Sequence, residues 1–461
     1  MKRALAAIGL LGAVATGAAE TTSHGRFDQI AVYQPKGAAQ QFVMLLSGSA
    51  GWDASTAATA QTLADRGALV AGIDTAALLA KLDAERDACT FPDGDFENLS
   101  HHLQAFYKLP TYLAPIIAGQ GSGASLAYAL VAQAPSTTFG GLLTSGFCPQ
   151  LPLHKPLCKG AGIHFKTTPP PASAALARSA VGAKPMLTLL PAAQLPVAWQ
   201  ALASGASACS PGTARRFVAQ VGQATWVASI DGNPPLAAAY AELALHNNAT
   251  VAPPPSDLAD LPIVEVPVEA AGQRFAVLVS GDGGWAGIDK ELGAALAARG
   301  IPVAGIDSLR YFWTPRTPAG LAGDLDRVIA YYAHHWQRSE VLLIGYSQGA
   351  DVLPFAINRL APATREKVKL HALLSLGQKA AFEFHVSNWL GPSGEEPILP
   401  EAAKLDAADT LCVYGERETD ALCPELKPGH AQVQALPGGH HYDGDYAGLA
   451  DLILKHAPPT R

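Results

Sequence analysis

Short apolar runs recur along the chain, and each ends in a turn rich in glycine, serine or aspartate before a helical segment begins. Runs of this length between turn residues are typical of buried strands. Strands that alternate with helical segments indicate parallel β-α-β units and a doubly wound α/β sheet. The expected strands lie at 41–46, 69–74, 116–118, 274–279, 302–307, 341–344, 410–414 and 432–436.

This pattern of strands, turns and helices occurs twice along the chain. The turn S-G-S-A-G-W at 47–52 recurs as S-G-D-G-G-W at 280–285, and the strand end A-G-I-D at 71–74 recurs at 304–307, both at an offset of 233 residues. A later strand repeats at an offset of 226, so the first copy carries about seven extra residues near 89–98. We therefore predict two tandem α/β domains built on one plan.

A proline-rich stretch around Pro253-Pro254-Pro255 separates the copies, and such a stretch is typical of a stiff linker. The predicted boundaries are a first domain at 20–246, a linker at 247–261 and a second domain at 262–461. Residues 1–19 carry a Lys2-Arg3 pair, an apolar core and small residues, which predicts a secretory signal peptide cut near Ala18 or Ala19.

The most informative stretch of the second copy is the apolar run 341–344 followed by G-Y-S-Q-G at 345–349 and an apolar helical segment. A strand, a tight G-x-S-x-G turn and a helix form the nucleophile elbow of serine hydrolases. The turn holds its serine in a strained conformation, so its neighbours must be small. The sequence thus predicts Ser347 as a catalytic nucleophile.

The first copy lacks this serine. Its corresponding turn is G-Q-G-S-G at 119–123, in which Gly121 is aligned with Ser347 and Ser122 with Gln348. No histidine follows the last strand of this copy near 224–227. We predict that the first domain is a non-catalytic relic.

A nucleophilic serine needs a base, and the base needs an acid that orients it. In this arrangement the acid and then the histidine follow the serine, each in a loop after a strand. The loop after 410–414 offers Glu418 and Asp420, of which Asp420 is the first choice and Glu418 the second. The loop after 432–436 reads G-G-H-H, where His440 is the predicted base and His441 the alternative.

The glycine-rich turn at 280–285 lies where the second donor of an oxyanion hole belongs. We predict that the hole is formed by the backbone N–H groups of Gln348 and Asp282.

The amino-acid composition limits the cellular compartment of the protein and the ligands that it is expected to bind. Six cysteines in an exported chain indicate disulfides, with Cys412 and Cys423 as a predicted pair and the four cysteines of the first half unassigned. With 15% charged residues, a net charge of −7 and no basic run, the chain is not expected to bind nucleic acid. No cysteine or histidine spacing suits a metal, and no cofactor is expected.

Several longer motifs are more specific than G-x-S-x-G. They are S-G-D-G-G-W at 280–285, A-G-I-D-S-L-R-Y-F-W at 304–313, R-T-P at 316–318, I-G-Y-S-Q-G-A-D at 344–351 and G-G-H-H-Y-D-G-D-Y at 438–446. In these motifs the second domain resembles the VirJ/AcvB family of bacterial periplasmic virulence-associated proteins. The tandem layout with a degenerate first copy resembles the longer, AcvB-type members.

This resemblance implies an α/β-hydrolase fold, degenerate in the first domain. It also implies hydrolysis of the aminoacyl ester of aminoacyl-phosphatidylglycerol, lysyl or alanyl, in the periplasm, with a membrane phospholipid as substrate. Two alternatives stay open: a periplasmic adaptor or chaperone linked to type IV secretion proteins, and a general periplasmic esterase or lipase.

An aminoacyl ester carries an ammonium group beside its scissile carbonyl, and a desolvated ammonium needs a carboxylate partner. Asp282 is the first candidate and Asp351 the second, because the first copy has Ser49 and Ser125 at these positions. The aromatic loop at 311–316 is a candidate for contact with the bilayer, with ordinary packing as the alternative.

Overall fold

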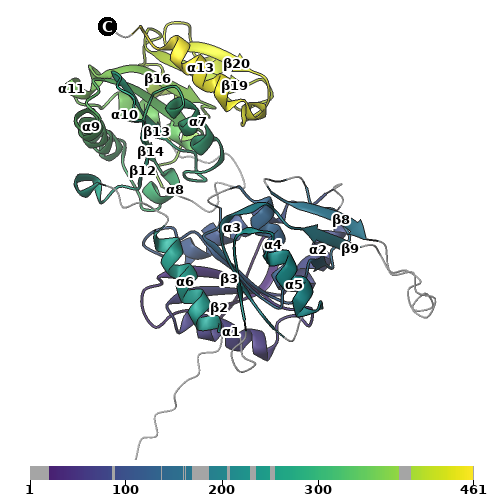
Figure 1. The fold of residues 1–461 in the computed structure, drawn as a ribbon. Coiled ribbons are helices and arrows are strands. Elements are labelled where there is room, and N and C mark those ends of the chain that lie inside the picture. The colour runs from purple at the N-terminus through teal and green to yellow at the C-terminus, as the bar shows by residue number, and fades with distance from the viewer. Residues whose placement is uncertain are drawn as a thin grey trace, which may run out of the picture.

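The computed structural model describes residues 20–85, 89–135, 138–158, 160, 162–168, 186–204, 208–228, 235–249, 255–383 and 396–459. The predicted signal peptide at 1–19 lies outside these residues. The described chain forms two α/β units that follow one another in sequence, and Figure 1 shows them as two separate bodies of helices around a sheet.

The first unit is built on an eight-stranded sheet in the order β1-β2-β4-β3-β5-β6-β10-β11. β1 and β2 are antiparallel to their neighbours, and the strands from β4 to β11 are parallel. A small sheet of β7, β9 and β8 is attached to it. The elements of this unit are β1 (Glu20–His24), β2 (Phe27–Tyr33), β3 (Gln41–Leu46), α1 (Ala54–Ala64), β4 (Ala68–Ile73), α2 (Thr75–Ala84), α3 (Pro92–Phe106), β5 (Ile116–Gln120), α4 (Ser122–Gln133), β6 (Gly141–Ser145), β7 (Gln150–Leu151), β8 (His164–Thr168), β9 (Met186–Leu190), β10 (Gln194–Leu202), α5 (Pro211–Val218), β11 (Gly222–Val227) and α6 (Leu236–Ala249).

The second unit is built on a seven-stranded sheet in the order β12-β14-β13-β15-β16-β19-β20. Only β12 is antiparallel to its neighbour among these strands. The elements are η1 (Ser256–Leu258), β12 (Ile263–Val266), β13 (Arg274–Val279), α7 (Gly287–Ala297), β14 (Val303–Ile306), α8 (Ser308–Tyr311), α9 (Pro318–His335), β15 (Glu340–Tyr346), α10 (Gln348–Ile357), α11 (Pro362–Arg365), β16 (Val368–Leu374), β17 (Lys379–Ala380), β18 (Glu396–Pro397), α12 (Leu399–Ala402), β19 (Thr410–Gly415), η3 (Cys423–Glu425), β20 (Gln432–Leu436), η4 (Tyr442–Gly444) and α13 (Tyr446–His456).

The two sheets share one strand order, which confirms the predicted repeat of a doubly wound α/β plan. In each, one antiparallel strand borders a parallel set whose third strand leads into a tight turn and a buried helix. This order, with the turn at the carboxyl edge of a central strand, is that of an α/β-hydrolase fold.

The repeated glycine and tryptophan motifs have one packing role in both copies. A Cβ atom on Gly305 would collide with the indole ring of Trp285, and one on Gly72 would collide with that of Trp52. Each tryptophan therefore lies flat against a strand backbone where only glycine leaves room.

The predicted boundary between the units is shifted by the structure. α6 continues to Ala249, and Asn247 on this helix donates to Gln41 Oε1 at 2.9 Å and to the carbonyl of Ala114 at 3.1 Å. On the other side, Leu258 and Leu261 are buried in the core of the second unit. The linker is thus shorter than 247–261, because both of its ends pack onto the neighbouring units.

Three disulfides join the cysteines, and none crosses between the units. Cys412–Cys423 has the predicted pairing. The first unit holds Cys89–Cys158 and Cys148–Cys209, so its sequence neighbours Cys148 and Cys158 are not paired with each other.

The units touch through an aromatic contact. Trp313 donates its indole N–H to the carbonyl of Leu109 at 2.6 Å, and its ring lies 5.6 Å from that of Tyr112. Figure 1 shows α3 and α8 at the ends of the two bodies that face each other.

We predict that Gly305→Ala destabilises the second unit, because the new methyl group overlaps a rigid indole ring beside a strand backbone. Overpacking of this kind costs roughly 1–3 kcal/mol of unfolding free energy. Gly323 in α9 is the matched control, since a Cβ there meets no atom within 4 Å. Gly323→Ala should stabilise the helix by roughly 0.5–1 kcal/mol. Chemical denaturation of both variants checks this, and equal stability of Gly305→Ala and the parent would contradict the packing described.

Candidate active site

The serine of the predicted elbow has the backbone conformation that the motif requires. Ser347 lies between β15 and α10 with φ +51° and ψ −120°, a region that residues other than glycine rarely occupy. A Cβ on Gly345 would lie 2.6 Å from the carbonyl carbon of Gly349, and one on Gly349 would collide with the carbonyl oxygen of Val279. The two glycines therefore allow the helix to approach the strands closely enough to expose the serine.

The first unit preserves this turn without its nucleophile. Gly121 has φ +52° and ψ −116°, nearly the values of Ser347. Ser122 is the first residue of α4, and no described residue offers its hydroxyl a hydrogen-bond partner. The elbow geometry has thus persisted with a residue that adopts it without strain.

The structure brings a histidine and a carboxylate to Ser347 in line. His440 Nε2 accepts from the Ser347 hydroxyl at 3.0 Å, and His440 Nδ1 donates to Glu418 Oε1 at 2.5 Å. The serine, the base and the acid come from three loops at the carboxyl ends of β15, β20 and β19. This relay of hydrogen bonds, from Ser347 through His440 to Glu418, is the arrangement that activates a serine hydroxyl.

The acid of the series is Glu418, and the first choice made from the sequence, Asp420, is wrong in this geometry. Glu418 follows β19 by three residues, and its carboxylate turns back to accept from the N–H of Gly415 at 2.6 Å and from the Ser375 hydroxyl at 3.1 Å. Only 8% of the Glu418 side chain is exposed, whereas Asp420 is exposed to solvent. Asp420 was preferred because it comes later in the loop than Glu418. The turn, however, folds the earlier part of the loop inward, so Glu418 is the buried acid.

His441, the alternative base, has a different partner. Its Nδ1 lies 3.3 Å from the hydroxyl of Tyr346, which also donates to the carbonyl of His440 at 3.2 Å. His441 thus contacts the Tyr346 hydroxyl, whereas the hydrogen bond to Ser347 is made by His440.

Two residues that the sequence argument did not single out hold the acid in place. Ser375 lies at the carboxyl end of β16 with φ +54°, and its hydroxyl is 2.7 Å from that of Tyr442. Tyr442 is 2% exposed and donates also to the carbonyl of Val413. A serine directly after a parallel strand, next to the elbow strand, was the available signal, since ligands and functional groups gather at that edge.

The electrostatics of the relay favour a charged imidazolium. Burial acts to lower the pKa of His440, but the hydrogen bond that His440 donates to Glu418 and the negative charges of Glu418, Asp282 and Asp351 outweigh it, so the pKa is raised. Burial opposes ionisation of Glu418 as well, but its hydrogen bonds hold its pKa below the ordinary value.

The loop predicted to provide an oxyanion donor adjoins the serine. A Cβ on Gly281 would lie 3.6 Å from Ser347 Cβ and 3.2 Å from the ring of Tyr346. Gln348 is the first residue of α10, so its N–H has no acceptor within the helix. The placement of Asp282 and Gln348 beside the serine suits the predicted hole, and their role stays a prediction.

The two acids expected to bind an ammonium group are both close to the relay. Burial raises the pKa of Asp282, against the positive charge of His440. Burial likewise raises the pKa of Asp351 to about 8, although Asp351 accepts from the N–H of Gly377 at 2.7 Å. At both carboxylates burial thus outweighs the positive charge of His440, so each pKa lies above its ordinary value.

The aromatic loop at 311–316 packs inside the protein. Tyr311 and Phe312 are 0% exposed. Arg316 lies over the Tyr311 ring at 4.4 Å, and Trp313 contacts the first unit. Of the two interpretations offered for this loop, the structure shows packing, and the aromatic side chains are not presented to a bilayer. None of the described helices combines the length and the apolar character needed to cross a membrane.

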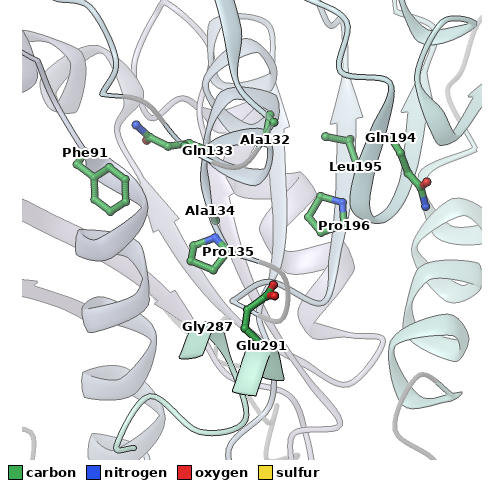
Figure 2. A pocket seen from close by; sticks show the side chains of 12 residues that line it. Phe91, Ala132, Gln133, Ala134, Pro135, Gln194, Leu195, Pro196, Gly287 and Glu291 are labelled. Carbon is green, nitrogen blue, oxygen red and sulfur yellow. The ribbon is translucent and has the colours of Figure 1, made fainter. Parts of the chain in front are cut away.

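Two cavities lie between the units, and neither is lined by Ser347 or His440. One, of about 550 Å³, is lined by first-unit residues and by Gly287 and Glu291 of α7, and Figure 2 shows Glu291 opposite Pro135 and Pro196. The other, of about 440 Å³, includes Arg310 and Arg316. Among the described residues, no three His, Cys, Asp or Glu side chains are grouped so as to hold a metal ion.

A comparison with protein-family profiles finds a match within the second unit. Residues 273–459 match the family profile described as "Bacterial virulence protein (VirJ)". No curated protein matches the chain.

Solved structures of several hydrolases are similar to part of the chain. Est1E from Butyrivibrio proteoclasticus has 13% sequence identity and a TM-score of 0.31, covering 42% of this chain and 93% of that one. XC6422 from Xanthomonas campestris, described as an a/b serine hydrolase without lid, has 13% identity and a TM-score of 0.28, covering 43% and 90%. Atu2452 from Agrobacterium tumefaciens, a protein of unknown function, has 20% identity and a TM-score of 0.31, covering 44% and 100%. The resemblance predicted from the motifs is thus confirmed over residues 273–459, a stretch that matches the VirJ profile and contains Ser347, Glu418 and His440.

Proposed function

We propose that the chain is a periplasmic serine hydrolase that cleaves the aminoacyl ester of aminoacyl-phosphatidylglycerol, lysyl or alanyl, to give the free amino acid and phosphatidylglycerol. The observation that carries the hydrolase is the hydrogen-bonded series from Glu418 through His440 to Ser347, with the serine strained at φ +51°. The VirJ-family match and the carboxylates near the relay support the aminoacyl substrate.

In the acylation step, Ser347 Oγ attacks the acyl carbonyl and His440 Nε2 takes the hydroxyl proton. Glu418 stabilises the imidazolium, and the N–H groups of Gln348 and Asp282 receive the negative charge that develops on the carbonyl oxygen. Collapse expels the glycerol oxygen of the lipid, which takes the proton from His440. Water, activated by the same histidine, then releases the amino acid from Ser347.

The substrate proposal rests on charge. The α-ammonium of an aminoacyl group lies next to the scissile carbonyl, so it must be received close to Ser347. We assign it to Asp282 first and Asp351 second, because burial raises the pKa of each and a bound cation would reverse that rise.

The compartment and the partner are parts of the same proposal. Disulfides persist in oxidising compartments, and the chain has three. The periplasm provides such a compartment and access to lipid head groups in the facing leaflet. We propose no cofactor, because the relay supplies the nucleophile, the base and the acid.

Ser347→Ala should abolish hydrolysis while leaving the fold unchanged, since one exposed hydroxyl is removed. Loss of the nucleophile lowers kcat on the order of 10⁶-fold. The measurement is the loss of lysyl- or alanyl-phosphatidylglycerol from vesicles, scored by lipid chromatography. Ser122→Ala is the matched control and should retain full activity. Turnover by Ser347→Ala within tenfold of the parent would contradict the mechanism, and hydrolysis of plain acyl esters alone would favour a general esterase.

Glu418→Gln and Asp420→Asn separate the two candidate acids. Removing the charge that orients His440 should lower kcat by roughly 10³- to 10⁴-fold for Glu418→Gln. Asp420→Asn should stay within a few-fold of the parent, because that side chain is exposed and outside the relay. The reverse ranking in steady-state kinetics would restore Asp420 as the acid.

The acid limb of kcat/KM reports His440, which must be neutral to accept the serine proton. Because the pKa of His440 is raised, activity should fall as the pH drops through a value above the ordinary 6.5. Asp282→Asn removes one of the negative charges that raise this pKa, so the limb should move to lower pH. Glu366→Gln, an exposed acid outside the site, should leave it in place. An unmoved limb in Asp282→Asn would mean that the two groups do not interact.

A further inference from the structure

Helix α3 of the first unit is connected to the turn at 280–285 of the second unit through Tyr112 and Leu309. The hydroxyl of Ser100 on α3 lies 3.1 Å from that of Tyr112. Tyr112 packs against Leu309 and Trp313 of the second unit. Through Tyr112, α3 of the first unit is therefore held close to the start of α8 in the second unit.

Leu309 continues this contact to the catalytic loop. A Cβ on Gly284 would lie 3.2 Å from Leu309 Cβ and 2.7 Å from Asp307 Oδ1. Gly284 belongs to the turn that contains Asp282 and Gly281, and Gly281 adjoins Ser347. The path from α3 to the nucleophile thus runs through packed side chains and one short turn.

Glu97 lies on the same α3 face, one helical turn before Ser100. Its carboxylate is half-buried and has no hydrogen bond or ion pair with another described residue. Burial, together with the negative charges of Asp93 and Asp282, raises the pKa of Glu97 to about 7. Glu97 and Asp282 thus come from different units, and the α3 face that carries Glu97 is the one that contacts Tyr112 through Ser100.

Three other buried side chains, Asp93, Asp289 and Gln348, each have an acceptor atom with no described donor. Asp93 is 2% exposed, and its Oδ1 has no hydrogen-bond partner among the described residues. Asp289 is 3% exposed, and its Oδ2 accepts from the N–H of Gly281 at 3.3 Å while its Oδ1 has no described partner. Gln348, the residue directly after Ser347, is 8% exposed, and its Oε1 also has no described hydrogen-bond partner.

Buried acceptors without donors are costly, and buried carboxylates more so. A ligand that brings a positive charge and several N–H donors satisfies both requirements. A primary ammonium has three donors and no acceptor. Arg310, a nearby cation, is held against Asp307 at 3.8 Å.

We propose that Glu97 of the first unit, together with Asp282, binds the ammonium group of the aminoacyl substrate at the active site of the second unit. This inference rests on the proposed function and gives the degenerate unit a role in it. The first unit supplies one wall of the acyl pocket, and substrate selection depends on both halves of the chain.

The test compares two glycerol esters in the full-length protein, 1-alanyl-glycerol and 1-isobutyryl-glycerol. They differ by an ammonium in place of a methyl group. Glu97→Gln keeps the shape of the side chain and removes its charge. The ratio of kcat/KM for alanyl over isobutyryl ester should fall by roughly tenfold or more, the effect of losing one hydrogen bond to a charged group. Glu97→Asp, which keeps the charge, should retain most of the parent's ratio.

Glu242→Gln is the matched control, because this acid lies exposed on α6 and outside the site. It should leave the ratio unchanged. Equal losses on both esters for Glu97→Gln, or no loss on either, would overturn the inference while the hydrolase proposal stands. If the parent protein cleaves neither ester, the proposed function fails and this inference with it. If Glu97→Gln does not fold, Glu97→Ala replaces it: a fall in the ratio supports the inference, and an unchanged ratio overturns it.

Discussion

The close approach of one helix to two strands governs the second unit. α10 begins so near β13 that a methyl group on Gly349 would overlap the carbonyl oxygen of Val279. This contact leaves Ser347 in its strained conformation and directs the first N–H groups of α10 toward the reacting centre. The loops that carry His440 and Glu418 end on neighbouring strands of the same sheet, so the relay assembles at one edge. Loss of the glycine contact would therefore change the distances from Ser347 to its neighbours on all of these loops.

The first unit has the same close packing of helix and strand at its elbow, but it has glycine where the second unit has Ser347. Its strand order, its tryptophan over glycine and its elbow dihedral angles repeat those of the second. What differs is the side chain at the turn and the loops after the last strands. The two units thus share one architecture, and Tyr112, which is hydrogen-bonded to Ser100 of α3, packs against Leu309 and Trp313 of the second unit.

The sequence predicted the features that follow from local patterns. Apolar runs located the strands, and the glycine spacing located Ser347, because a tight turn restricts which residues fit. His440 followed from its position after the last strand. The choice between Glu418 and Asp420 could not be made in this way, since it depends on how the turn after β19 folds toward Ser375. The pairing of Cys89 with Cys158, and the approach of Glu97 to Asp282, join distant parts of the chain that no local pattern connects.

The glycine at position 121 has a consequence for the history of such a tandem chain. A serine at an elbow stores strain of the order of 1–3 kcal/mol, and glycine adopts the same angles without it. In a duplicated chain, a change from serine to glycine at this turn is therefore favoured by stability wherever the hydroxyl is not required. The opposite change carries the cost of the strain. Stability alone thus favours glycine at an elbow, and only a use for the hydroxyl keeps the serine in place.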